Sequence, residues 1–226
     1  MKVQNKLKYL VIPLLLIKII AANALMPDEK TIEALKPKLN SERIAYFFGN
    51  YHIEQLNVCS SVFPESRISN LYSSHDDVKI MRTLAIVNYV TPINPLLKTS
   101  HTKILTGTSI GIALRDAGWE VIKKPIYFGE ITLSANVMKW MHEKTRSTGT
   151  IHIYQLEVKS DEHPTLIPYC TIIEIHSPQY LTNTWLKALN GKDFIEHQTA
   201  NSNVNNLLPR IEKCLAEFPI PGIQTK

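Results

Sequence analysis

TIHIYQLEVK at residues 150–159 and TLIPYCTIIEI at residues 165–175 are the two stretches that decide the fold. β-Branched and aromatic residues dominate both of them, and this composition is typical of β-strands. The polar residues SDEHP at 160–164 separate the two stretches and end in Pro164, which favours a turn. We therefore predict a hairpin whose two strands pair in the antiparallel direction.

Similar runs on the N-terminal side of this hairpin predict more strands. Gly49 and Asn50 separate two such runs, and we expect a tight turn between them. His75, Asp76 and Asp77 separate another pair of runs. The expected strands are Arg43–Phe48 with His52–Val58, Arg67–Ser73 with Val78–Val90, and Trp119–Thr132 with interruptions near Pro125 and Gly129.

Apolar residues at helical spacing predict helices between and after these strands. Ser134 is a candidate N-cap, and Ser177 followed by Pro178 is a stronger one. The expected helices are Pro27–Leu35, Ile110–Ala117, a helix after Ser134 that carries Val137, Trp140 and Met141, Pro178–Leu189, and Val204–Phe218. Runs of strands broken by single helices predict an α+β fold, with an antiparallel β-sheet and helices packed on one of its faces.

The first 24 residues have the pattern of a secretory signal peptide. A basic start precedes the apolar residues 9–17, and ANA at residues 22–24 fits the small-x-small cleavage site. The longer segment Tyr9–Ala22 contains Lys18 and spans only 14 residues, fewer than the about 20 that cross a bilayer, so we expect cleavage. Residues 25–226 are then a single globular domain, secreted or periplasmic. The lack of an Asn-x-Ser/Thr sequon favours a bacterial source.

The charge of the chain argues against some classes of partner. The 226 residues contain 25 Lys and Arg against 20 Asp and Glu, a net charge of +5. Four of the lysines lie in the predicted signal peptide, which has no acid, so the mature chain carries only +1. Binding of nucleic acid needs a larger basic excess, and we expect no nucleic-acid partner. An apolar content of 44% argues against a disordered protein, and we expect no stable membrane insertion after cleavage.

The chain has three cysteines, Cys59, Cys170 and Cys214. Export would place them in a compartment where disulfides persist, and an odd number leaves one thiol over within a monomer. Three pairings are possible. We predict Cys170–Cys214, because this bond would tie a strand to the last helix.

Ser109 lies in a G-x-S-x-G pattern, Gly107-Thr108-Ser109-Ile110-Gly111. This pattern is typical of the nucleophile elbow of α/β-hydrolases, where a strand leads through a sharp turn into a helix. Residues 103–106 are the candidate strand, and His176 is a candidate base. The alternative, which we favour, is an ordinary helix start, because the surrounding strands are expected to be antiparallel and no second oxyanion-hole motif is present.

The predicted hairpin places a second set of reactive side chains together. With residues 160–164 as the loop, His152 faces Ile172 and Tyr154 faces Cys170. One face then carries His152, Tyr154, Cys170, Glu174 and His176. This set could bind a ligand, hold a metal ion through His152, Glu174 and His176, or place His152 as a base beside a Cys170 nucleophile. A register slip by one residue would separate the two halves, and a plain sheet face is the alternative.

Arg82 is the third candidate. It falls in an apolar row with Leu84 and Ile86 by the two-residue period of a strand. A charge in that row needs a partner, and we expect an acidic residue on a neighbouring strand. A ligand carboxylate or phosphate is the alternative, because guanidinium binds such groups with two hydrogen bonds.

Three functions follow from these patterns. The first is an exported binding or interaction protein whose partner is an unknown protein or small molecule. The second is a small serine hydrolase that uses Ser109, and the third is a metal-dependent enzyme at His152, Glu174 and His176. We favour the first function and predict no cofactor. The sequence leaves open whether the chain is an enzyme.

Overall fold

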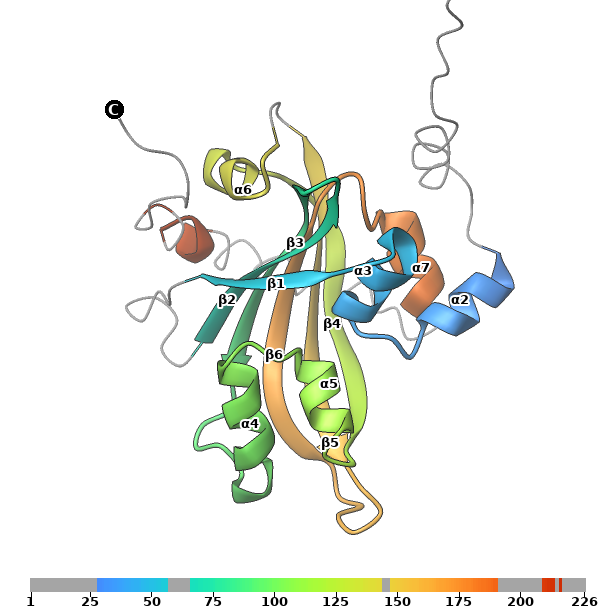
Figure 1. Ribbon diagram of the computed structural model, residues 1–226, viewed down its shortest axis with the longest axis vertical. Coiled ribbons are helices and arrows are strands. Elements are labelled where there is room, and N and C mark those ends of the chain that lie inside the picture. The colour runs from blue at the N-terminus through green and yellow to red at the C-terminus, as the bar shows by residue number, and fades with distance from the viewer. Residues whose placement is uncertain (1–27, 57–65, 144–146, 191–208, 214–215, 217–226) are drawn as a thin grey trace, which may run out of the picture.

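The computed structural model describes residues 28–56, 66–143, 147–190, 209–213 and 216. Its centre is one six-stranded sheet in the order β1-β2-β3-β6-β5-β4, and all neighbouring strands are antiparallel (Figure 1). The strands are β1 (His52–Leu56), β2 (Ser66–His75), β3 (Val78–Tyr89), β4 (Glu120–Thr132), β5 (Thr148–Lys159) and β6 (Ile167–His176). The α+β class predicted from the sequence is confirmed.

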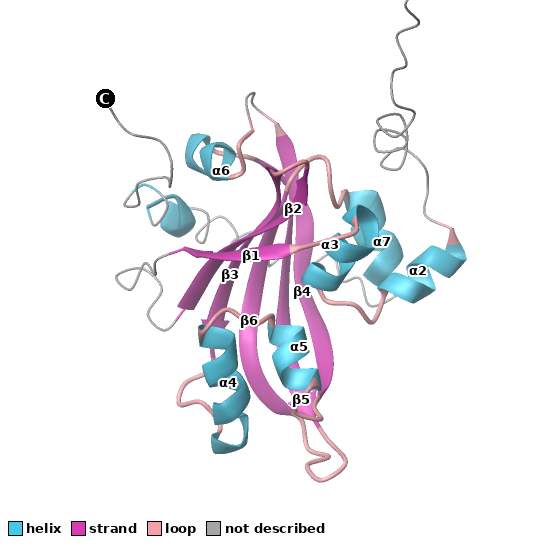
Figure 2. Cartoon of the chain, viewed as in Figure 1, coloured by secondary structure: helices cyan, strands magenta, loops and turns pink. Residues whose placement is uncertain are grey.

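Helices flank this sheet (Figure 2). The helices are α2 (Glu29–Leu35), α3 (Asn40–Phe48), α4 (Lys98–Leu105), α5 (Ile110–Arg115), α6 (Ala135–Trp140) and α7 (Asn183–Asn190), with a 3-10 turn at Pro95–Leu97 and a further helix at residues 209–213. Their starts follow local chemistry, since Asp28 and Ser134 each accept a hydrogen bond from the backbone N–H three residues later. Among the described residues, no helix is long and apolar enough to cross a membrane.

The two faces of the sheet have different neighbours. We call one the isoleucine-rich face, because Leu84, Ile86, Ile151, Ile153, Ile173 and Ile175 form its centre. Val137 and Trp140 of α6 and Ile211 pack against it. We call the other the helix-covered face, because apolar residues of α3, α4, α5 and α7 pack on it; in Figure 1, α4 and α5 lie in front of its strands. Two apolar clusters hold these helices, one under α4 and α5 and the other under α2, α3 and α7.

The strand predicted at Arg43–Phe48 is wrong, because these residues belong to α3. The Glu42 side chain accepts a hydrogen bond from the Leu39 N–H and closes the first turn of the helix. Gly49 ends the helix with a φ of 80°, a left-handed conformation that glycine adopts without strain. The apolar run that suggested a strand instead supplies the face of α3 that packs on Trp185 and Tyr180 through Phe47.

Two further boundaries differ from the prediction. Residues 103–106 are not a strand, because α4 extends to Leu105. The helix predicted from Pro178 begins only at Asn183. The Ser177 hydroxyl does accept a backbone hydrogen bond, from Gln179 N at 3.2 Å, but it closes a turn and not a helix.

The central hairpin forms with a register two residues away from the predicted one. His152 lies opposite Glu174, and Tyr154 lies opposite Ile172. The pairing shifts at Leu156, where Tyr169 is an extra residue in β6. Because side chains alternate with a period of two, a shift by two residues keeps each of them on its predicted face.

Candidate functional site

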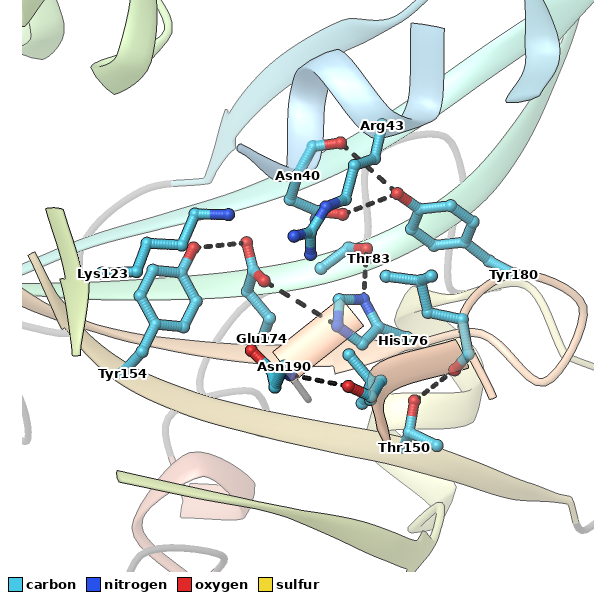
Figure 3. A network of polar contacts seen from close by, with 12 residues as sticks. Asn40, Arg43, Thr83, Lys123, Thr150, Tyr154, Glu174, His176, Tyr180 and Asn190 are labelled. Carbon is cyan, nitrogen blue, oxygen red and sulfur yellow. Dashed lines mark hydrogen bonds and ion pairs between the residues drawn. The ribbon is translucent and has the colours of Figure 1, made fainter. Parts of the chain in front are cut away.

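Polar side chains gather on the helix-covered face of β5 and β6, where the sequence predicted them. His152, Tyr154, Glu174 and His176 all lie on this face and are at most 4% exposed. Figure 3 shows Tyr154, Glu174 and His176 pointing into one cluster with residues from α3. Burial of such groups costs free energy unless they are hydrogen-bonded or paired. Their partners therefore define the site.

Glu174 is the centre of the cluster. Its Oε1 accepts a hydrogen bond from the Tyr154 hydroxyl at 3.0 Å, and its Oε2 lies 3.8 Å from Nε2 of His176 (Figure 3). On the other side of the ring, Nδ1 of His176 is hydrogen-bonded to the Thr83 hydroxyl at 2.8 Å. These contacts fix the carboxylate and the imidazole relative to each other.

Two cations that the sequence analysis did not select lie beside this carboxylate. Arg43 of α3 is only 3% exposed, and its Nε donates to the Leu35 carbonyl at 3.1 Å. Lys123 of β4 donates to the Lys38 carbonyl, and its ammonium lies 5.9 Å from the ring of Tyr154. Burial raises the pKa of the Glu174 carboxyl, and the charges of Lys123 and Arg43 act in the opposite direction. The sequence analysis did not select Arg43, because residues 43–48 were predicted to form a strand.

Asn40 and Tyr180 close the cluster on the side of α3. The Tyr180 hydroxyl donates to Oδ1 of Asn40 at 2.8 Å. Asn40 also acts to lower the pKa of Glu174, although burial has the larger effect and raises it. Tyr180, which lies before α7, is thus joined to the first residue of α3 at the side of the cluster (Figure 3).

The two histidines are held in their neutral form. Burial lowers the pKa of His152 well below its ordinary value, and it lowers the pKa of His176 to about 3. Neither ring nitrogen of His152 has a hydrogen-bond partner, nor does Nε2 of His176. His152, Glu174 and His176 offer three ligand atoms that lie within 4.8 Å of one another. This donor set is the one predicted from the sequence.

A small cavity adjoins the cluster, with a volume of about 40 Å³. One water molecule needs about 10–15 Å³ of such volume, so the cavity has room for roughly three water-sized groups. Its apolar walls come from Leu39, Ile53, Leu71, Ala85, Val87, Ile110, Gly111 and Ile172, and its polar lining from Asn40, Ser41, Arg67, Ser109, Tyr154 and Glu174. Walls that are mainly apolar with a few convergent polar groups are typical of a small-molecule site.

Arg67 is the charged residue of this cavity that the sequence analysis missed. It lies opposite Val87 on the helix-covered face and is 6% exposed. Its Nη1 donates to the Ile104 carbonyl at 2.9 Å, whereas its Nε has no hydrogen-bond partner. A charge inside a predicted strand was the signal that selected Arg82, and the same signal was available for Arg67.

Arg82 does not lie where the sequence analysis placed it. Leu71 pairs with Thr83 and Tyr72 with Met81, so Arg82 is an extra residue in β3. The bulge takes its side chain out of the apolar row. The guanidinium lies 3.5 Å from the ring centroid of Phe48, and its Nε donates to the Ser73 hydroxyl. The expected ion pair is wrong, since no carboxylate pairs with Arg82 among the described residues.

Ser109 lines the cavity but has no base beside it. Its hydroxyl lies 3.0 Å from the Ser41 hydroxyl and also hydrogen-bonds with Tyr51. In the part of the chain that the structure describes, no histidine is hydrogen-bonded to it. A helix, α4, precedes the turn at Gly107, whereas the nucleophile elbow needs a strand there.

Cys170 is a free, buried thiol. It lies opposite Leu156, and burial raises the pKa of the thiol, which disfavours the reactive thiolate. The disulfide predicted with Cys214 is not formed, because Cys170 packs in the apolar cluster under α4 and α5. Cys59 and Cys214 lie outside the described residues.

Comparisons of the sequence with protein families and with curated proteins found no match. Among solved structures, the chain is similar to gene product SA0254 from Staphylococcus aureus, with 11% identity and a TM-score of 0.39 over 62% of this chain and 90% of that one. It is also similar to PhnF from Mycobacterium smegmatis, with 10% identity and a TM-score of 0.41 over 64% and 66% of the two chains. The C-terminal domain of YurK from Bacillus subtilis has 14% identity and a TM-score of 0.30 over 57% and 89%. Values this low assign no function.

Proposed function

We propose that this chain is a binding domain that holds a small organic anion in the cavity between α3, α5 and the sheet. The observation that carries the proposal is the Arg67 guanidinium, which is buried at the cavity with an unpaired Nε donor. A buried charged donor without a partner costs more free energy than a neutral one. A carboxylate or phosphate oxygen would supply that partner, because guanidinium matches the geometry of both groups.

The charge balance around the cavity supports an anion. Arg43 and Arg67 bring positive charge to the site. Lys123 adds to this charge, because the Glu174 carboxylate opposes the lowering of the Lys123 pKa by burial and by Arg43. Among the described residues, Glu174 is the one carboxylate that lines the cavity. Glu42 also acts on Lys123, but it is paired with Arg115. Removal of several like charges from water is unfavourable without a counter-charge. A bound anion would reduce this cost.

The remaining lining suggests how the anion is oriented. Ser41 and Ser109 offer hydroxyl groups at the α3 and α5 side of the cavity. The opposite apolar wall, which includes Leu71 and Val87, suits an alkyl or aryl part of the ligand. Because the cavity volume is only about 40 Å³, the ligand class is a small organic acid with one anionic group and a short apolar part, and the larger acids tested below serve as probes of size.

Thermal unfolding of the purified chain with acetate, butyrate, benzoate or inorganic phosphate tests the proposal. An anion that binds should raise the melting temperature by about 3–6 °C at ten times its dissociation constant. The neutral amides of the three organic acids serve as matched ligands without charge.

Two variants locate the effect. Arg67→Met should abolish the stabilisation by the acids, whereas Lys79→Met removes an exposed charge and should leave it unchanged. Stabilisation that persists in Arg67→Met would overturn the proposed site. If none of the four anions stabilises the wild-type protein, the proposal of a small-anion site is wrong.

Export remains part of the proposal, since residues 1–27 lie outside the described part of the chain. We expect the secreted or periplasmic form to begin at Leu25, after the predicted cleavage site. N-terminal sequencing of the protein from fractionated cells checks this. An intact Met1 in the membrane fraction would contradict cleavage.

A further inference from the structure

Strand pairing brings together the three possible metal ligands, His152, Glu174 and His176. His152 lies opposite Glu174 in the β5–β6 ladder, and His176 follows two residues later on the same face. Their ligand atoms lie within 4.8 Å of one another, and the three residues are between 0% and 4% exposed. The two histidines do not line the cavity of the proposed anion site. The proposed anion site therefore makes no use of these two histidines.

The hydrogen bonds of the three donor residues leave at least one ligand atom of each residue available. Thr83 is hydrogen-bonded to Nδ1 of His176 at 2.8 Å, so Nε2 is the nitrogen that faces Glu174. Tyr154 donates to one carboxylate oxygen, and the other lies toward His176. Both nitrogens of His152 are buried without a partner. His176 and Glu174 therefore each have the outer hydrogen bond that is typical of metal ligands, whereas His152 offers either of its nitrogens without one.

We propose that His152, Glu174 and His176 bind a divalent transition-metal ion, with zinc as the favoured one. Two imidazole nitrogens and one carboxylate oxygen are ligands that zinc accepts, and three protein ligands leave a fourth position for water or another group. Donor atoms around tetrahedral zinc lie about 3.4 Å apart, so the side chains must approach one another by roughly 1 Å. This site goes beyond the proposed anion site and does not depend on it.

The protonation states favour the metal, and the neighbouring charges oppose it. Burial keeps both histidines neutral by lowering their pKa, and neutral imidazole is the form that ligates. Arg43 and Lys123 face Glu174 and repel a cation. Removal of one of these charges should therefore strengthen metal binding, which is the opposite of its expected effect on an anion.

The test is a titration of the EDTA-dialysed full chain with zinc chloride, followed by calorimetry, and with cobalt, followed by its visible absorption bands. We expect one ion per chain. His152→Ala and His176→Ala should each weaken zinc binding by about 100-fold. His75→Ala and His163→Ala are the controls, because both residues lie outside the cluster and should leave the affinity unchanged.

Lys123→Met keeps the test decisive if a histidine variant fails to fold. We expect it to strengthen zinc binding by about three- to tenfold, because it removes a positive charge near Glu174. The proposal is overturned if the wild-type chain binds no zinc, if folded histidine variants bind zinc as tightly as the wild type, or if Lys123→Met leaves the affinity unchanged. Because no organic acid is present, these outcomes are independent of the anion test.

Discussion

The two faces of strands β3, β5 and β6 carry opposite chemistry. On the isoleucine-rich face, Ile151, Ile153, Ile173 and Ile175 pack with α6, and these residues carry no polar side-chain atom. On the helix-covered face of the same strands, apolar positions such as Ala85, Val87 and Ile172 alternate with a polar group that the other face lacks, which consists of Thr83, His152, Tyr154, Glu174 and His176. Both sets are buried to a similar degree. Burial alone therefore does not distinguish the structural face from the candidate functional one.

The two faces differ in the free energy of burying their side chains. Apolar burial stabilises a fold in proportion to the area removed from water. A buried polar network contributes little net stability, and it is costly wherever a donor lacks a partner. The unpaired nitrogens of His152 and Arg67 are such costs. We infer that the isoleucine-rich face contributes stability without a polar cost, and that the helix-covered face, which is held by its own apolar clusters, gives up part of its stability at the polar positions to hold a ligand.

The largest expected effect is on the isoleucine-rich face. Ile175→Ala removes a side chain that is fully buried, and it should lower the free energy of unfolding by about 2–5 kcal/mol. Urea denaturation measures this change. Ile112→Ala is the matched control at an exposed position of α5 and should change the value by less than about 0.5 kcal/mol. Equal losses in the two variants would refute the assigned role of this face.

The helix-covered face should instead make stability depend on pH. The pKa values of His152 and His176 are lowered in the folded chain, so below a pH of about 6.5 the unfolded chain binds more protons than the folded one. Stability should fall as the pH drops from about 6.5 toward the lowered folded values, and it should be fully present above this window. The raised pKa of Glu174 acts in the opposite direction at the acid end.

Urea denaturation at a series of pH values between 7 and 5 tests this dependence. His176→Gln should reduce the slope of unfolding free energy against pH by the equivalent of one proton. His75→Gln, a change at an exposed position, should leave the slope as it is in the wild type. Identical slopes in the wild type and His176→Gln would show that His176 is not buried in its neutral form.

The smallest effect is expected at Ser109. Ser109→Ala removes a hydrogen bond with Ser41, and it should cost about 1 kcal/mol of stability. It should change the affinity for an organic acid far less than Arg67→Met does, because it removes no charge. Labelling of the wild-type chain by a phosphonate esterase probe, abolished in Ser109→Ala, would contradict this and favour the hydrolase alternative.

The comparison also explains which features the sequence could predict. The period of two placed His152, Tyr154, Glu174 and His176 on one face, and a two-residue error in register did not change that result. The pattern did not reveal Arg82, because a bulge in β3 breaks the alternation at that residue. Turn chemistry predicted the β2–β3 and β5–β6 hairpins, where polar residues separate the runs.

The rest of the site depends on tertiary contacts. Arg43 and Asn40 reach Glu174 only because residues 40–48 form a helix that packs across the sheet. The segment that contains Arg43 has β-branched and aromatic residues, and its local pattern favoured a strand. Lys123 comes from β4, an edge strand, and its contact with the cluster follows from the strand order β6-β5-β4. Strand order is not encoded in local sequence patterns.

The most direct test of the anion site is the Nε–H resonance of Arg67. Chain labelled with ¹⁵N-arginine is titrated with acetate, butyrate, benzoate and inorganic phosphate in turn, and the arginine Nε–H signals are assigned by substitution. We expect the Arg67 signal to shift and saturate with at least one of these acids, while the signal of Arg115, which is paired with Glu42, stays in place. An Arg67 signal that does not move with any of them would contradict an anion site on the helix-covered face.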